Sequence, residues 1–162
     1  MGDPRPGETV LPFDPANSAD DTVAFIGTIR SPWGKEDCPK NIGRARETGQ
    51  GAHIELTEGY GPGLQGLSVG QAIVLLYWMD RTRRDIIVQR PRHVDGPRGV
   101  FALRSPARPN PIAMCTVRIT ELDPEAGRIG IDAIDVYDGT PLVDLKPWLE
   151  TVDIPPAAKD PL

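Results

Sequence analysis

The sequence predicts an all-β fold of mostly antiparallel strands, arranged as an irregular β-barrel or sandwich with few short helices. Two observations carry this prediction. Short segments rich in β-branched or aromatic residues recur along the chain with turn residues between them. The 17 glycines and 18 prolines among the 162 residues interrupt the chain too often for long helices.

Five segments have the composition of strands. We expect these strands at residues 23–29, 52–56, 73–79, 85–89 and 99–103. The segment Ile73–Met79 is apolar at every position. An apolar run of this length is typical of a strand that is buried on both faces, so we expect it to be a central strand.

A hairpin is predicted after these segments. Every second residue from Cys115 to Ile119 is apolar, and the residues between them are polar. This alternation is typical of a strand with one buried face. Turn residues follow at 123–127, and Ile129 and Ile131 resume the apolar face.

The two ends of the chain differ from its middle. Residues 1–21 contain prolines and acidic residues with little apolar periodicity, and residues 153–162 are similar. We expect a flexible N-terminal tail and a short C-terminal tail at these positions. The folded domain is then predicted at residues 22–152, which is enough chain for one core.

Composition favours a cytoplasmic protein that has no membrane segment. No apolar run approaches the roughly 20 residues that span a bilayer, and the N-terminus lacks the features of a signal peptide. Cys38 and Cys115 are the only cysteines. Two cysteines in a domain of this size do not suggest a disulfide scaffold, so we expect a reducing compartment.

The net charge of −5 conceals a basic block. Residues 81–108 contain eight arginines and two aspartates, and the rest of the chain is strongly acidic. Such a block is typical of a surface that binds anions or nucleic acid. A solvated loop with internal ion pairs would have the same composition, and the charge pattern alone leaves both interpretations open.

Several familiar kinds of site are not supported. Gly61–Gly66 has the glycine spacing of a dinucleotide-binding loop, but the helix that this loop requires is not predicted after it. The only histidines, His53 and His93, have no neighbouring ligands at helical spacing, so no metal site is predicted. No serine lies in a nucleophile elbow, and neither cysteine has a partner for nucleophilic chemistry.

Two proline-rich runs, residues 104–112 and 138–148, carry the strongest functional signal. Proline fixes the backbone, so the first run should hold Arg104, Arg108 and Asn110 with little remaining freedom. Arginine forks suit carboxylates and phosphates, and an asparagine amide suits a base edge or a carboxyl group. We interpret the two runs as the walls of a ligand site.

The second run begins with Asp-Gly-Thr-Pro at residues 138–141, which predicts a tight turn whose polar side chains face the ligand. Asp144 and Lys146 alternate with apolar residues, so they should share one face of a short strand. Purely structural turns, with Arg104 paired to Asp138 or Asp144, remain the alternative interpretation.

The same runs resemble the signature of the TsaA-like (TrmO) family. The resemblance lies in residues 99–112 and 138–148, with further similarity at residues 26–33 and 90–92, and it extends over residues 23–150. It implies a β-barrel methyltransferase that uses S-adenosylmethionine. Characterised members methylate the exocyclic N6 nitrogen of threonylcarbamoyladenosine in tRNA, and their cofactor pocket lies near a homodimer interface. Residues 77–79 would suit a buried or shared surface.

The resemblance also assigns site residues. It places the cofactor contacts on Pro39, Lys40, Asn41, Asp80, Arg81, Arg104, Met114, Asp138, Gly139, Thr140 and Pro141. The residues expected to contact the substrate are Arg92, Arg108, Asn110, Asp144 and Lys146. The sequence identifies no general base, so the catalytic residues stay unassigned.

The chain also departs from the family pattern. Asp80 and Arg81 stand where many members have a His-Gln pair, and Ala113 replaces the usual glycine. The overall charge is acidic, and we expect none of the extra C-terminal domain that many bacterial members carry. These departures favour an alternative, namely an S-adenosylmethionine-binding module or a small-molecule methyltransferase that does not act on tRNA.

Overall fold

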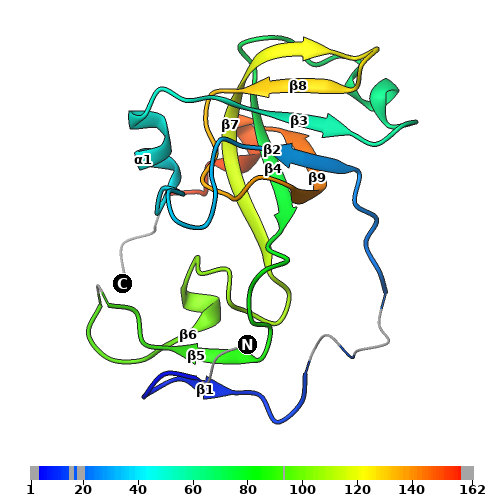
Figure 1. Ribbon diagram of the computed structural model, residues 1–162. Helices are drawn as coiled ribbons and strands as arrows, with labels where there is room; N and C mark the ends of the chain where they lie inside the picture. The colour runs from blue at the N-terminus through cyan, green and yellow to red at the C-terminus, as the bar shows by residue number, and fades with distance from the viewer. Residues whose placement is uncertain (1–3, 15–16, 18–20, 93, 158–162) are drawn as a thin grey trace.

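The computed structural model describes residues 4–14, 17, 21–92 and 94–157, and it has two sheets (Figure 1). The closed barrel consists, in spatial order, of β2 (Gly27–Arg30), β3 (Ala52–Leu56), β8 (Arg128–Ile131), β7 (Ile112–Asp123), β4 (Ala72–Trp78) and β9 (Thr140–Pro147). The smaller sheet consists of β1 (Thr9–Val10), β5 (Ile86–Gln89) and β6 (Arg98–Gly99). The strand pairs of the described residues are antiparallel, which confirms the predicted fold class.

Helices are few and short in the described part of the chain. They are α1 (Ile42–Glu47), α2 (Glu150–Asp153) and the 3-10 turns η2 (Gly61–Leu64) and η3 (Val100–Ala102). Among the described residues, no helix is long and apolar enough to cross a lipid bilayer. In Figure 1 the small sheet lies beyond one end of the barrel, joined to it through the chain between β4 and β7.

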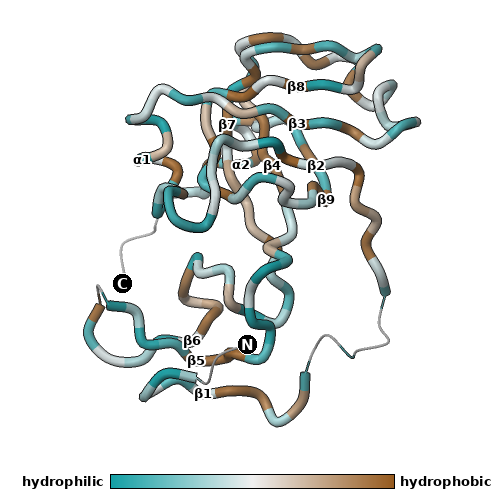
Figure 2. Tube along the Cα trace, in the orientation of Figure 1, coloured by the Kyte–Doolittle hydropathy of each residue, from teal (hydrophilic) through white to brown (hydrophobic). Residues whose placement is uncertain are grey.

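The core fills the interior of the barrel, because alternate residues of each strand point inward. β4 is hydrogen-bonded to β7 on one side and to β9 on the other, so the predicted central strand is confirmed. Ile73, Leu75 and Tyr77 of this strand are buried, whereas the alternate residues are only half-buried. Along other barrel strands, Figure 2 shows hydrophobic residues interspersed with hydrophilic ones.

The predicted hairpin is β7 and β8. Cys115, Val117 and Ile119 are buried on the inner face, and the residues between them are exposed. Ile129 of β8 is also buried, and β7 pairs with β8 around a turn that contains Gly127 at φ +63°. A positive φ is accessible to glycine without steric cost, which explains its place in this turn.

Three details differ from the sequence prediction. The strand predicted at 23–29 begins only at Gly27, and the strand predicted at 99–103 is wrong, because residues 100–102 form the turn η3. Val100 is completely buried, whereas Phe101 is exposed. The apolar residues here therefore form a turn that buries one side chain, and not a strand. Helix α1 was not predicted, although Asn41 caps it by accepting a hydrogen bond from the Arg44 amide at 3.0 Å.

Part of the predicted N-terminal tail is paired with the folded domain. Within it, β1 pairs with β5, and the Leu11 amide donates to the Asp85 carbonyl at 2.8 Å. Residues 1–3, 15–16 and 18–20 of this segment, His93, and residues 158–162 of the C-terminal segment lie outside the described residues.

Candidate functional site

Three long connections between strands lie at one end of the barrel. In the antiparallel barrel, the ends of β2, β4 and β8 and the starts of β3, β7 and β9 lie together, as the pairs Ile29 with Thr140 and Trp78 with Ile112 show. The connections at residues 31–51, 79–111 and 132–139 leave from this end. We refer to it, with these three connections, as the site end of the barrel.

Most of the predicted site residues lie at this site end. On the three connections are Pro39, Lys40, Asn41, Asp80, Arg81, Arg92, Arg104, Arg108, Asn110, Asp138 and Gly139, while Met114, Thr140 and Pro141 lie in the first residues of β7 or β9. Asp144 and Lys146 lie further along β9, opposite Leu76 and Val74, and form an ion pair with each other at 2.7 Å. The barrel thus brings together segments that are far apart in the sequence.

The turn at Asp138 is fixed against the chain that follows β2. The Asp138 amide donates to the Trp33 carbonyl at 2.8 Å, and a carboxylate oxygen of Asp138 accepts from the Ser31 amide at 3.2 Å. The same carboxylate lies 3.5 Å from the Arg30 guanidinium. Gly139 has φ +82°, which permits the tight turn that the sequence predicted. The backbone here is therefore held on both sides.

Arg81 links the connection after β4 to this turn. Its Nη2 donates to the Asp138 carbonyl at 3.1 Å, and its guanidinium lies 5.9 Å from the centre of the Tyr137 ring. Arg81 and Asp80 face each other, with 3.8 Å between the guanidinium Nε and the carboxylate. Two groups assigned separately from the sequence are thus in direct contact.

Arg104 reaches the start of β7. Its Nη2 donates to the Met114 carbonyl at 2.6 Å, so two further predicted cofactor residues are in contact. The alternative interpretation paired Arg104 with Asp138 or Asp144, but Asp138 lies against Arg30 and Asp144 against Lys146. The Arg104 side chain is exposed, which leaves its guanidinium accessible to an anionic ligand.

The Arg108 side chain binds backbone carbonyls of the connection on which it lies, residues 79–111. Its Nη2 donates to the carbonyls of Val100 and Leu103, and its buried Nε has no hydrogen-bond partner among the described residues. Asn110 is held as well, because its side-chain oxygen accepts from Arg84 Nη2 at 3.3 Å. These contacts stabilise the proline-rich run, and a direct contact of either side chain with substrate stays a prediction.

Asp135 is a charged group that the sequence reasoning missed. It is half-buried between the buried residues Ile134 and Val136, and this burial raises its pKa, while Arg104 and Arg46 act against the rise. An acidic residue inside an apolar stretch, three positions before Asp138, was the available signal. The carboxyl adds negative charge close to Arg104, where a cationic ligand group would be stabilised.

Both thiols are poor nucleophiles. Burial, followed by the nearby Asp135 carboxyl, raises the pKa of Cys115 to about 12 and that of Cys38 to about 11. Since the thiolate is the reactive form, neither cysteine is activated for nucleophilic chemistry. No group of three or more His, Cys, Asp or Glu side chains within the described ranges could hold a metal ion.

The raised pKa of Asp135 predicts a pH-dependent effect of replacing it. The folded protein holds the Asp135 proton more tightly than the unfolded chain, so this residue costs stability as pH rises from its ordinary pKa of 3.8 toward the folded value. We therefore expect Asp135→Asn to raise the midpoint of thermal unfolding at neutral pH, with the gain vanishing in acid. A difference between the two proteins that is the same at every pH would contradict this assignment.

The chain is similar to a defined group of proteins. The family model "tRNA-methyltransferase O N-terminal domain" matches residues 28–154. A probable S-adenosyl-L-methionine-binding protein of Archaeoglobus fulgidus is 38% identical over 133 residues, which are 79% of this chain and 34% of that protein. An S-adenosyl-L-methionine-binding protein of the same organism is 35% identical over 128 residues, which are 79% of this chain and 89% of that protein.

A solved structure shares the fold. The crystal structure of TrmO from Pseudomonas aeruginosa superposes with a TM-score of 0.65 at 28% identity, covering 86% of this chain and 61% of that chain. The chain thus spans about a third of the first of these curated relatives and less than two thirds of the chain in the solved structure. The shared region includes the barrel and the three connections of the site end.

Proposed function

The chain belongs to the tRNA-methyltransferase O N-terminal domain family, and we propose that it is an S-adenosylmethionine-dependent methyltransferase of the cytoplasm. Its proposed target is the N6 nitrogen of threonylcarbamoyladenosine in tRNA. The observation that carries the proposal is a pair of hydrogen bonds at one end of the barrel. Arg81 donates to the Asp138 carbonyl, and Arg104 donates to the Met114 carbonyl. Relatives of the chain are named as S-adenosyl-L-methionine-binding proteins.

The chemistry of the site end fits this cofactor. S-adenosylmethionine supplies a methyl group on a cationic sulfur and carries its own carboxylate. The Asp135 and Asp138 carboxyls would stabilise the positive charge, and the Arg104 fork would bind the carboxylate. The turn at residues 138–141, held by the Trp33 carbonyl and the Ser31 amide, would keep the bound ligand in one orientation.

Methyl transfer depends mainly on positioning, because the acceptor nitrogen must approach in line with the bond that breaks. The acceptor in threonylcarbamoyladenosine carries a threonyl carboxylate, and the surrounding tRNA carries phosphates. The arginines of residues 79–111 provide matching positive charge, and Arg92 is among the exposed ones. The arginine block therefore suits an anionic acceptor better than a neutral metabolite.

We propose that the active form is a homodimer. The segment 77–79 is largely packed inside this chain, with Tyr77 buried and the Trp78 ring 6.3 Å from that of Phe25. Ile112 and Met114 at the start of β7 are instead exposed, beside Arg104. A partner subunit would cover these apolar side chains. Light scattering that finds only monomers at working concentrations would exclude this arrangement.

The proposed methyltransferase activity is tested by measuring the mass of threonylcarbamoyladenosine from treated tRNA. Incubating the protein with tRNA and S-adenosylmethionine should add one methyl group to threonylcarbamoyladenosine, as seen by mass spectrometry of digested nucleosides. Binding to tRNA should also weaken steeply with salt, because arginine contacts to phosphates release counterions. Tryptophan fluorescence or anisotropy at several salt concentrations would measure this slope.

The alternative is a binding module or a methyltransferase for a small molecule, which the net charge of −5 favours. Cofactor binding by calorimetry without any methylation or tRNA binding would support it. Absence of cofactor binding would overturn both proposals.

A further inference from the structure

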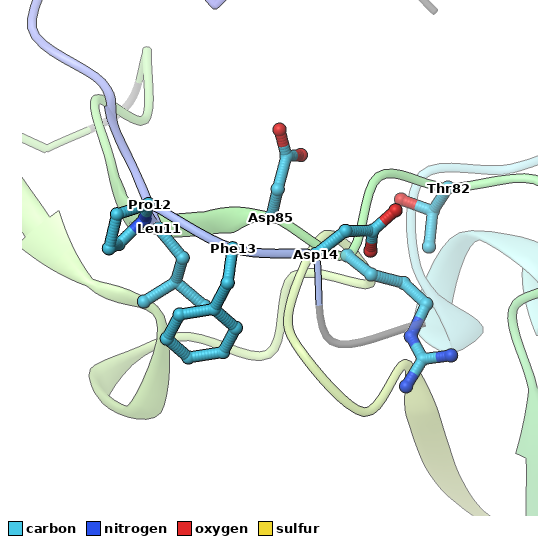
Figure 3. Close-up of a pocket in the computed structure, with 7 residues that line it drawn as sticks. Leu11, Pro12, Phe13, Asp14, Thr82 and Asp85 are labelled. Atoms are coloured by element: carbon cyan, nitrogen blue, oxygen red, sulfur yellow. The ribbon is translucent and has the colours of Figure 1, made fainter. Parts of the chain in front are cut away.

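A cavity lies beneath the N-terminal segment, which precedes the residues that match the family model. It has a volume of about 390 Å³, and the residues that line it are Leu11, Pro12, Phe13, Asp14, Thr82, Arg84 and Asp85 (Figure 3). None of the residues predicted to bind the cofactor is among them. The hydrogen bond from the Leu11 amide to the Asp85 carbonyl, at 2.8 Å, attaches this segment beside β5.

Phe13 offers a flat apolar face at this cavity. Its side chain is 63% exposed, so it is not a core residue. Figure 3 shows the Phe13 ring on the side of the segment opposite to the Asp85 carboxylate, and Figure 2 shows that the chain after β1 is hydrophobic. An exposed aromatic ring two residues beyond the paired Leu11 is suited to stacking against a planar ligand.

The charges around the cavity favour a neutral ring over a phosphate. Asp14 and Asp85 contribute carboxylates to the lining, and Asp85 is paired with Arg83 at 2.6 Å. Arg84 and Arg83 offset these two carboxylates, so the lining has no excess positive charge that would favour a phosphate over a neutral ring. Arg84 is stacked on the Trp78 ring at 5.3 Å, which keeps its guanidinium plane in a fixed orientation.

The cavity is joined to the predicted substrate residues by a single side chain. Arg84 lines the cavity, and it also donates to the Pro109 carbonyl at 2.7 Å and to the Asn110 side chain at 3.3 Å. A ligand in the cavity would therefore lie one residue away from Asn110. In RNA, a nucleotide next to the modified one could occupy this position.

We propose that this cavity binds an unpaired nucleobase of the substrate RNA, stacked on Phe13. The inference rests on the proposed function, because it takes tRNA as the substrate. Proteins that read single-stranded RNA loops turn bases out of the stack and hold them on aromatic side chains. The N-terminal segment would then give this chain a contact with RNA that its family-matched region does not contain.

The test is a titration of a labelled anticodon stem-loop with the full chain, followed by fluorescence anisotropy. Phe13→Ala should weaken binding roughly 5- to 150-fold, the range found when a stacking aromatic is removed. Phe13→Trp should bind as well as the unaltered chain. Tyr60→Ala is the matched control, because Tyr60 is a 42% exposed aromatic on the connection between β3 and β4, at the other end of the barrel.

A series of stem-loops, each with one abasic position, identifies the bound base. At one position only, removing the base should abolish the difference between Phe13→Ala and the unaltered chain. If Phe13→Ala binds the intact stem-loop as tightly as Tyr60→Ala does, the cavity is not a base site, and the proposed function is unaffected. If the unaltered chain binds no RNA, both the base site and the tRNA substrate are overturned.

Discussion

Replacing Arg104 by alanine should weaken the binding of S-adenosylmethionine roughly 10- to 150-fold, measured by calorimetry. The estimate is the usual contribution of a hydrogen bond to a charged group, expressed as a ratio of dissociation constants. The side chain is exposed and its Nη2 is anchored on the Met114 carbonyl at 2.6 Å, so the guanidinium is oriented without being buried. We therefore expect a loss of affinity with little loss of stability.

Two further variants complete the test. One distinguishes the charge of Arg104 from the shape of its guanidinium, and the other is a control. Arg104→Lys keeps the positive charge but loses the planar fork, so its affinity should lie between those of the alanine variant and the unaltered protein. Arg98→Ala removes an exposed arginine of the same connection that contacts only its neighbouring Pro97 carbonyl in our structure, and it should bind normally. Unchanged affinity in Arg104→Ala would remove this residue from the site.

The barrel could be predicted because its signals are local. Two short segments each indicate a buried strand from their own residues alone. They are the alternating segment Cys115–Ile119 and the apolar run Ile73–Met79. The short strands β1 and β6 have two residues each, too few for any period to show. Residues 99–103 have strand composition, but the burial of Val100 and the contacts of Arg108 hold them as a turn.

The candidate site was only partly accessible from the sequence. The proline-rich runs and the family resemblance indicated Arg104 and Asp138, whose residue types are distinctive. Asp135 was missed because its pKa depends on burial and on Arg104 and Arg46, which lie far away in the sequence. Only closure of the barrel brings these residues together. The cavity at Phe13 depends likewise on the pairing of β1 with β5.

Replacing Trp33 by alanine should lower the free energy of unfolding by about 3–5 kcal/mol, the usual cost of removing a buried tryptophan. Trp33 is only 7% exposed, and its indole Nε1 donates to the Ile134 carbonyl at 2.7 Å. Its removal leaves both a cavity and a buried carbonyl without a donor. Single domains are stable by about 5–15 kcal/mol, so a large share of the total would be lost.

Urea denaturation of three variants measures this loss of stability. It also separates the contribution of the buried ring from that of the indole hydrogen bond. Trp33→Phe keeps most of the ring but loses the indole donor, so it should cost about 1–2 kcal/mol. Phe101→Ala removes an aromatic that is 84% exposed and should change stability by no more than about 0.5 kcal/mol. The Trp33 indole donates to the Ile134 carbonyl at one end of the segment that carries Asp135, and Trp33→Ala removes this contact. The Trp33 backbone carbonyl, which accepts from the Asp138 amide at the other end, is kept in the variant. The folded fraction of Trp33→Ala should therefore also bind S-adenosylmethionine more weakly, whereas a variant as stable as Phe101→Ala would show that this segment is held by other contacts.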